Sequence, residues 1–352
     1  MRMNIRLGIL GGGQLGRMSA QAATELGIET IIYTDSEKGP ASQVASKTYV
    51  GDYTDIKKLT AFAQDVDIIS YEFENIPVET IKLLKTLKPV HPDETLLKTS
   101  QHRIIEKSFL NEIGIPTAKW SGVKNTDEIK KSLEEWSATS CIIKTCRFGY
   151  DGKGQARHSV GDSFPNFGTD DLIAEEIIDF DFEVSVIVAR DVNGKCVFYG
   201  PLHNEHKNHI LDITTSPATN ISDELAAEAR GMAETIADEV NLQGILTLEL
   251  FVTKNGDLLA NEIAPRTHNS GHYSMDACDA SQFENHVRAV CGLDVVEPNQ
   301  HSQAQMINLI GSDVNDLSKY MDMKNATIHL YGKEDVKEGR KMGHVNILGD
   351  KL

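Results

Sequence analysis

The strongest constraint on the fold is an alternation of short apolar strands with helices over the first hundred residues. Residues 5–10 (IRLGIL) lead through GGGQLG into the helical pattern MSAQAATELG, and a second apolar run, ETIIYTD, ends at Asp35. The alternation continues through DVDIISYEFENI and a helix over Val78–Leu87. Strands separated by such helices are joined by right-handed crossovers into a parallel sheet with both faces covered. We therefore predict an α/β lobe over residues 1–102.

The pattern then changes to a smaller mixed lobe and to antiparallel pairs. Residues 103–178 contain the helix TDEIKKSLEEW, the strands CIIKT and DLIAEEII, and a glycine-rich turn. Residues 179–352 contain DFEVSVIVAR and KCVFYGPL around an Asn193-Gly194 turn, and a long helix from the Ser222 cap to Val240. The polar segment 203–210 (HNEHKNHI) is predicted to be a loop. The fold class is α/β and α+β, in three lobes.

The first glycine-rich turn has two interpretations. Gly11, Gly13 and Gly16 form GxGxxG after a strand, and Asp35 has the spacing of a ribose-binding acid, as in a nicotinamide dehydrogenase. Glycine is also favoured in any tight strand-to-helix turn, and a helix N-terminus attracts any anion. A dehydrogenase would continue into a second nucleotide-binding half, whereas this chain changes to the small lobe. We favour the second interpretation, with Gln14 close to a ligand over the turn.

A second glycine loop, residues 149–155 (GYDGKGQ), lies between two predicted strands. Its three glycines let backbone N–H groups approach an anion, which is typical of a flexible flap over phosphates. Lys144 on the preceding strand is able to reach the same cleft. The alternative is an ordinary glycine hairpin with a solvated lysine. Tyr150, Asp151 and Lys153 in the loop favour the phosphate flap.

A predicted hairpin brings two carboxylates together. The dipeptide Asn255-Gly256 predicts a two-residue turn that pairs Lys254 with Asp257. Counting back along both strands places Glu249 directly opposite Glu262. Like charges destabilise such a pair, and the neighbours are apolar, so the two acids need a proton or a cation between them. Mg²⁺, with Mn²⁺ as the alternative, suits carboxylates and phosphates. A bulge that turns one acid to solvent is the competing interpretation.

Three further polar segments are candidates for binding. Residues 175–178 and Glu183 offer backbone groups and carboxylates between two lobes, although such an acidic run also occurs in solvated turns. Residues 261–273 (NEIAPRTHNSGHY) follow the second glutamate and are expected to bind an anionic substrate, a purely structural loop being the alternative. Residues 331–344 carry Lys333, Lys337, Arg340 and Lys341, which composition alone would describe as a solvated basic loop. The histidines at 203, 206 and 209 are not expected to bind zinc.

Charge and apolar runs exclude several kinds of partner. Lys and Arg number 35 against 52 Asp and Glu, and this net charge of −17 disfavours a nucleic acid or an anionic membrane. No run approaches the roughly 18 apolar residues of a membrane span, and the N-terminal run LGIL is too short for a signal peptide. Five cysteines without a CxxC pair indicate reduced thiols rather than disulfides or a zinc site. We therefore expect a cytoplasmic protein.

Four motifs together resemble a known family. GGGQLGRM, GYDGKGQ, NEIAPRTHNSGHY and GRKMGHVN make the chain similar, in order and over nearly its whole length, to the 5-(carboxyamino)imidazole ribonucleotide synthetases. The resemblance implies a three-lobed ATP-grasp fold and a homodimer. It also implies an ATP-dependent carbon–nitrogen ligase of purine biosynthesis, which uses ATP, bicarbonate and 5-aminoimidazole ribonucleotide to form the carbamate, ADP and phosphate.

The resemblance also implies roles for particular residues. The ATP site would comprise Arg103, Lys144, Gly149, Tyr150, Asp151, Gly152, Lys153, Gly154, Gln155, Glu175, Glu176, Ile177, Ile178, Glu183, His206, Asn261 and Glu262. The metal ligands would be Glu249 and Glu262, in agreement with the hairpin count. The substrate side would comprise Gln14, Glu74, Tyr150, Asp151, Asn269, Lys333 and Arg340, and the catalytic residues would be Arg266, His268 and Lys153. Cys146 departs from the pattern, because a basic residue is expected there.

The implied chemistry moves a γ-phosphoryl group onto bicarbonate and forms carboxyphosphate, which water destroys quickly. Such a reaction depends on positioning, charge neutralisation and exclusion of water rather than on a covalent enzyme intermediate. A sister ATP-grasp enzyme that uses formate and glycinamide ribonucleotide is the nearest alternative. A binding subunit without catalysis is disfavoured by the paired acids and the two lysine–glycine elements.

Overall fold

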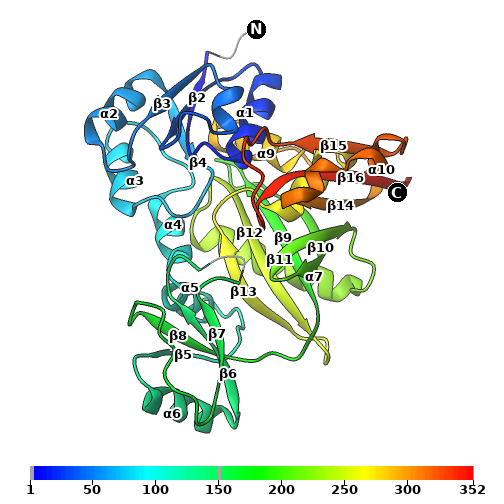
Figure 1. Cartoon of the computed structure of the whole chain (residues 1–352). Coiled ribbons are helices and arrows are strands. Elements are labelled where there is room, and N and C mark those ends of the chain that lie inside the picture. The colour runs from blue at the N-terminus through cyan, green and yellow to red at the C-terminus, as the bar shows by residue number, and fades with distance from the viewer. Residues whose placement is uncertain (1–3, 150–151, 352) are drawn as a thin grey trace.

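The computed structural model describes residues 4–149 and 152–351, which form three lobes, each built on its own sheet (Figure 1). The N-terminal lobe and the small lobe lie at opposite ends of the molecule, and the largest sheet lies between them. None of the helices in the described part of the chain has the length and apolar composition needed to cross a bilayer.

The N-terminal lobe is the predicted parallel α/β unit. Its strands, in the order β3-β2-β1-β4, are β1 (Arg6–Leu10), β2 (Glu29–Thr34), β3 (Lys47–Val50) and β4 (Ile68–Tyr71). Its helices are α1 (Gln14–Glu25), η1 (Ala41–Gln43), α2 (Ile56–Asp65), α3 (Val78–Lys85) and α4 (Glu94–Ser100). Two separate apolar clusters, one with α1 and one with α2 and α3, cover the two faces of the sheet. The parallel sheet expected from the alternation is therefore confirmed.

The small lobe follows α5 (Arg103–Glu112) and is antiparallel. Its sheet has the order β5-β8-β6-β7, with β5 (Trp120–Val123), β6 (Ser140–Thr145), β7 (Gln155–Ser159) and β8 (Leu172–Glu176). Helix α6 (Thr126–Trp136) covers one face, and it begins where the Asn125 side chain accepts a hydrogen bond from the Glu128 amide. Leu110 of α5 packs in the core of the large sheet instead, so α5 connects the two units.

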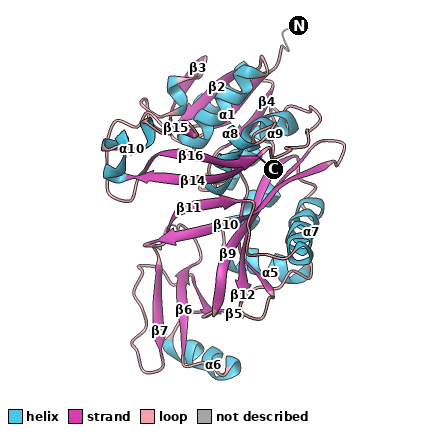
Figure 2. Ribbon diagram, turned by 90° about the vertical axis from the view of Figure 1, so that its right-hand side faces the viewer, coloured by secondary structure: helices cyan, strands magenta, loops and turns pink. Residues whose placement is uncertain are grey.

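The large sheet has eight strands in the order β13-β12-β9-β10-β11-β14-β16-β15, which Figure 2 shows with α7 alongside. The strands are β9 (Phe180–Arg190), β10 (Cys196–Lys207), β11 (Ile210–Ser216), β12 (Gly244–Thr253), β13 (Leu258–Ala264), β14 (Ser302–Ile310), β15 (Ala326–Leu330) and β16 (Lys341–Lys351). The helices are α7 (Asp223–Glu239), η2 (Asn269–Tyr273), α8 (Ser274–Ala277), α9 (Gln282–Val290), η3 (Gly311–Asn315) and α10 (Ser318–Met321). The Ser222 side chain caps α7, as the sequence predicted.

The predicted loop at residues 203–210 is wrong, because this segment is the end of β10 and the turn into β11. Asn208 and His209 both have positive φ angles and form a two-residue hairpin turn without glycine. Inside the sheet, Asn204 is buried and its amide nitrogen donates to Ser185 Oγ at 2.9 Å, while Thr214 Oγ1 donates to its oxygen at 2.9 Å. From its sequence alone this polar segment looks like a loop. Pairing with both neighbouring strands gives its buried polar groups hydrogen-bond partners, so it is stable as a strand.

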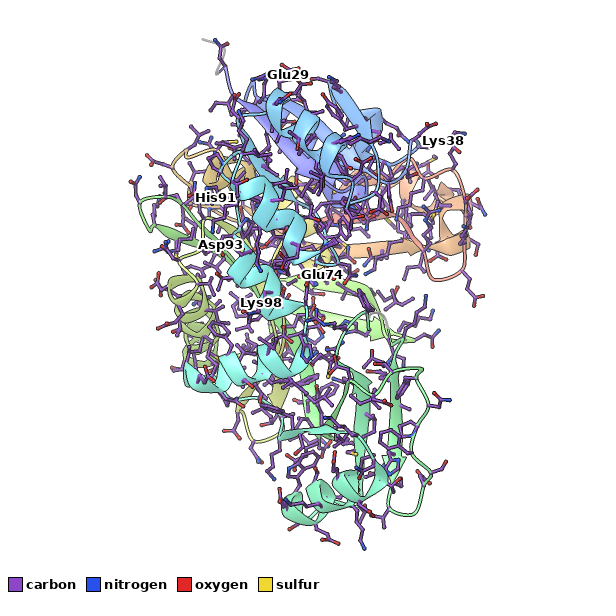
Figure 3. The ribbon with its side chains drawn as sticks, turned by 90° about the vertical axis from the view of Figure 1, so that its left-hand side faces the viewer. Glu29, Lys38, Glu74, His91, Asp93 and Lys98 are labelled. Carbon is purple, nitrogen blue, oxygen red and sulfur yellow. The ribbon has the colours of Figure 1, made fainter. Side chains whose placement is uncertain are left out.

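The connection between β15 and β16 lies against the N-terminal lobe. The Gln43 amide donates to the Gly332 carbonyl at 2.7 Å, and Lys38 pairs with Glu334 at 3.2 Å. Figure 3 labels Lys38, which projects towards this C-terminal connection. The segment between β15 and β16 is therefore held against residues 38–43, which follow β2.

Candidate active site

A cavity of about 490 Å³ lies between the small lobe and the large sheet. Its lining includes most of the residues that the sequence singled out: Glu74, Arg103, Lys144, Gly149, Gly152, Lys153, Gln155, Glu175, Glu176, Ile177, Ile178, Glu183, His206, Glu249, Asn261, Glu262, Arg266, His268 and Asn269. The sequence reasoning had not assigned the other lining residues to a site: Ala118, Ile142, Phe180, His209, Leu211, Phe251 and Lys341. Tyr150 and Asp151 lie outside the described residues.

The carboxylates Glu249 and Glu262 are directly opposed in the β12–β13 ladder. The predicted pairing is correct, but the path to it differs. The turn is one residue longer than expected, since Thr253 rather than Lys254 pairs with Asp257. A bulge at Asn261 then restores the register. The bulge does not turn either acid away, because both line the cavity.

Each of the opposed acids has a basic side chain as its partner in the protein. His268 Nε2 lies 2.8 Å from Glu249 Oε1, and Arg103 Nη1 lies 3.2 Å from Glu262 Oε2. Burial would raise the pKa of Glu249, but the contact with His268 outweighs it and lowers the pKa to about 2. Glu249 is therefore an anion at neutral pH. Two carboxylates that face one cavity are the hard oxygen donors that a divalent cation such as Mg²⁺ requires, so the residues fit the expected metal.

A buried ion network lies at the end of the cavity that Lys144 and Glu175 line. Lys144 Nζ contacts Glu175 Oε2 at 2.7 Å, and Lys107 Nζ lies 3.9 Å from the same oxygen. Burial would raise the pKa of Glu175, but the two lysines outweigh it and lower the pKa. Lys107 is 1% exposed and donates to the carbonyls of Ala260 and Asn261. The sequence reasoning missed Lys107, because a lysine on an amphipathic helix looks solvated until the packing is known.

The described part of the glycine flap lies against the β10–β11 turn. Gly152 has φ +78°, and a Cβ there would lie 2.7 Å from the His209 Cβ. Gly154 has φ +72°, and a Cβ there would lie 2.6 Å from Thr145 Oγ1. Glycine is thus required at both positions by conformation and by space. Gly154 does not line the cavity but accepts a hydrogen bond from the Thr145 amide at 2.8 Å.

The chain that leaves β8 passes one edge of the cavity. Glu176, Ile177 and Ile178 line the cavity as the chain enters β9. On β9, Glu183 Oε1 lies 3.4 Å from His206 Nδ1 of β10. Burial alone would lower the pKa of His206, but the Glu183 carboxylate raises it overall. The edge therefore presents backbone groups, apolar side chains and an acid to the cavity.

The other end of the cavity contains a bidentate ion pair. Arg266 Nε and Nη2 donate to the two carboxylate oxygens of Glu74 at 2.5 and 3.1 Å. Figure 3 shows Glu74 where the N-terminal lobe meets the rest of the molecule. Burial would raise the pKa of Glu74, but the Arg266 charge outweighs it and lowers the pKa. The Asn269 amide nitrogen donates to Asn308 Oδ1 at 3.0 Å, which fixes this polar segment.

The first glycine turn is occupied by a carboxylate of the protein itself. The Glu72 side chain accepts hydrogen bonds from the amides of Gly13 and Gly16, at the N-terminal end of α1. Burial raises the pKa of Glu72 despite these bonds. A dinucleotide pyrophosphate would need the same amides, so the arrangement opposes the dehydrogenase interpretation. The sequence reasoning missed Glu72, which is separated from the turn by more than fifty residues.

Three predicted substrate residues lie near this turn and outside the cavity lining. Gln14 is half-buried at the start of α1. Lys333 Nζ donates to the Lys341 carbonyl at 2.6 Å, and Arg340 Nη1 donates to the Asp335 carbonyl at 3.0 Å. Burial lowers the pKa of Lys333 to about 8, so its charge is sensitive to a phosphate nearby. Lys341 links this basic segment to the cavity, which it lines.

Comparisons with known proteins cover nearly the whole chain. Residues 3–101 match the model of the ribonucleotide synthetase preATP-grasp domain, residues 108–283 that of the ATP-grasp domain, and residues 304–352 that of the phosphoribosylaminoimidazole carboxylase C-terminal domain. The chain is 44% identical over 345 residues to the N5-carboxyaminoimidazole ribonucleotide synthase of Brucella melitensis, covering 96% of this chain and 95% of that protein. For the Bacillus subtilis synthase the identity is 38% over 349 residues, covering 97% and 91%.

Solved structures of N5-carboxyaminoimidazole ribonucleotide synthases are also similar to this chain over nearly its whole length. The N5-carboxyaminoimidazole synthetase of Staphylococcus aureus, complexed with ADP, matches with a TM-score of 0.94 at 36% identity, over 99% of this chain and 94% of that chain. The Aspergillus clavatus synthase, in complex with ADP and 5-aminoimidazole ribonucleotide, matches with a TM-score of 0.89 at 25% identity, over 99% and 95%.

Proposed function

The chain belongs to the N5-carboxyaminoimidazole ribonucleotide synthase family, the same family that its motifs resemble, and on this premise we propose that it carboxylates the amine of 5-aminoimidazole ribonucleotide with ATP and bicarbonate. It is an ATP-dependent ligase with the three-lobed ATP-grasp fold. The single observation that carries the proposal is one cavity in which two opposed carboxylates, a glycine flap and Lys144 meet.

The proposal assigns the nucleotide to the end of the cavity that Lys144 and the flap enclose. There Lys144 and the flap amides would neutralise the phosphates, and residues 176–178 would face the purine. Glu183 would accept hydrogen bonds from the ribose hydroxyls. Glu249 and Glu262 would hold Mg²⁺, with Mn²⁺ as a substitute. When bound, the cation neutralises charge on the phosphates during phosphoryl transfer.

Bicarbonate is assigned to the space beside Arg266, His268 and Lys153. A bicarbonate oxygen takes the γ-phosphoryl group from ATP, which leaves ADP and carboxyphosphate. The exocyclic amine then bonds to the carboxyl carbon, of carboxyphosphate or of CO₂ released from it, and phosphate leaves while the nitrogen loses a proton. Arg266, oriented by Glu74, would hold the anion, and the flap would exclude water.

The proposed activity is tested by measuring phosphate release from ATP. With bicarbonate and Mg²⁺, adding 5-aminoimidazole ribonucleotide should increase the rate at least about tenfold, and ¹³C-bicarbonate should appear as a carbamate carbon by NMR. Formate with glycinamide ribonucleotide is the control for the sister enzyme. Greater stimulation by that pair, or no stimulation by 5-aminoimidazole ribonucleotide, would refute the proposal.

Four further parts of the proposal rest on the sequence and the resemblance. These are the lobe boundaries 1–102, 103–178 and 179–352, a cytoplasmic location, the absence of a nucleic acid or membrane partner, and a homodimer. Light scattering coupled to size-exclusion chromatography measures the last directly, and a mass of twice 38.8 kDa is expected.

A further inference from the structure

Three potential metal ligands gather at the base of the glycine flap, outside the catalytic assignment. His102 precedes α5, Cys146 follows β6, and Asp171 precedes β8. One ligand atom from each lies within 4.8 Å of the other two, and His102 Nε2 is 3.1 Å from Asp171 Oδ2. Hydrogen bonds of the backbone hold the three segments in place: the Arg103 amide donates to the Cys146 carbonyl at 3.0 Å, and the Cys146 amide donates to the Asp171 carbonyl at 2.9 Å.

The exposure of the three side chains suits a metal site. The Cys146 side chain is buried, the His102 side chain is 14% exposed, and that of Asp171 is 48% exposed. The cluster is therefore reachable from solvent on the Asp171 side, where water is able to complete the coordination. The His102 Nδ1 atom is buried and has no hydrogen-bond partner among the described residues. The contacts of Nε2 within the cluster therefore orient the ring.

The chemistry of the three donors selects a class of cation. Thiolate, imidazole and carboxylate together match Zn²⁺ and similar borderline cations, whereas Mg²⁺ prefers oxygen donors alone. Without a cation, burial and the neighbouring Asp171 raise the pKa of the Cys146 thiol to about 12. A bound cation would release this proton to solvent and take the sulfur as a ligand.

We propose that His102, Cys146 and Asp171 bind one divalent cation of the zinc class, at a site separate from the opposed carboxylates of β12 and β13. The cation would join the segment before α5 to both strand ends at the base of the flap. Arg103, which contacts Glu262 and the Gly149 carbonyl, directly follows His102. Occupancy would thus hold Arg103 and the flap base in one arrangement.

The test uses Co²⁺ as a spectroscopic probe of the full-length protein, stripped of metal and free of Mg²⁺ and nucleotide. One equivalent of Co²⁺ should produce a thiolate-to-cobalt charge-transfer band, and Zn²⁺ should displace it. Cys146→Ser should remove the band. Asp171→Asn, at an exposed position that preserves folding, should weaken Co²⁺ binding by at least about tenfold, since losing a ligand costs more than losing an outer contact.

Two controls separate this site from others in the chain. Cys196→Ser alters a half-buried thiol elsewhere and should leave the band unchanged. Glu249→Gln should also leave it unchanged, because that acid belongs to the other site. Absence of the band in the unmodified protein, its persistence in Cys146→Ser, or its loss in Glu249→Gln would each overturn the proposal.

Discussion

Glu249 and Glu262 show how single residues acquire a function through their neighbours. Each acid is paired with a basic side chain of the protein, His268 or Arg103, and both acids still face the cavity. The pairing keeps Glu249 ionised, as its pKa of about 2 indicates. A cation between the acids would therefore bind to charge that is already present.

The metal assignment predicts the effect of Glu262→Gln. This change preserves the size of the side chain but removes one charge, so ATP turnover should fall by about a hundredfold or more. The melting temperature should change little, because Glu262 is 42% exposed and its pair with Arg103 is partly solvated. Glu134→Gln, at a 69% exposed position on α6, is the matched control. Turnover near the unmodified rate with Mg²⁺ would show that Glu262 is not a metal ligand.

At the scale of elements, the flap and the β10–β11 hairpin act as a pair. Gly152 lies against His209 at the hairpin turn, and the Gly149 carbonyl accepts a hydrogen bond from Arg103. The flap thus packs against the turn of the β10–β11 hairpin. The polar end of β10 reaches the cavity at this contact.

Nucleotide binding should order this flap further. Amides in residues 147–155 should exchange hydrogen at least about tenfold more slowly with a non-hydrolysable ATP analogue, which corresponds to about 1.4 kcal/mol of local stability. Amides of α7 provide the internal control and should not change. Equal exchange of the flap with and without the analogue would contradict its role over phosphates.

At the scale of the whole molecule, the region proposed to bind the acceptor is assembled from distant parts of the chain. The connection between β15 and β16 contacts the N-terminal lobe through Gly332 and Glu334, which brings Lys333 close to Glu72. The basic loop is therefore not simply solvated. It lies beside the first glycine turn, apart from the end of the cavity that is proposed to bind ATP, and the proposed ribonucleotide phosphate would require cations of its own there.

This arrangement predicts a selective effect of Arg340→Ala. A charge-assisted hydrogen bond to phosphate contributes about 1.5–3 kcal/mol, so the KM for 5-aminoimidazole ribonucleotide should rise roughly ten- to a hundredfold. The KM for ATP and the slow bicarbonate-dependent ATPase should stay nearly constant. Lys337→Ala is the matched control, since Lys337 is 68% exposed in the same segment. A parallel loss of ATP affinity would place the segment at the nucleotide site instead.

Local patterns in the sequence determined much of this molecule. The alternation of strands and helices, the Ser222 cap and the opposed pair of Glu249 and Glu262 all depend on residues close to one another in the chain. Even so, the glutamate pairing was correct because a longer turn and a bulge at Asn261 offset each other. Counting from a turn is reliable only when such irregularities cancel or are absent.

The tertiary structure alone decided which distant groups meet. It placed Glu72 on the amides of the first glycine turn, buried Lys107 beside Glu175, and turned the polar segment at 203–210 into paired strands. It also brought His102, Cys146 and Asp171 together. These outcomes depend on long-range packing and on satisfying buried polar groups, whose partners cannot be identified from nearby residues.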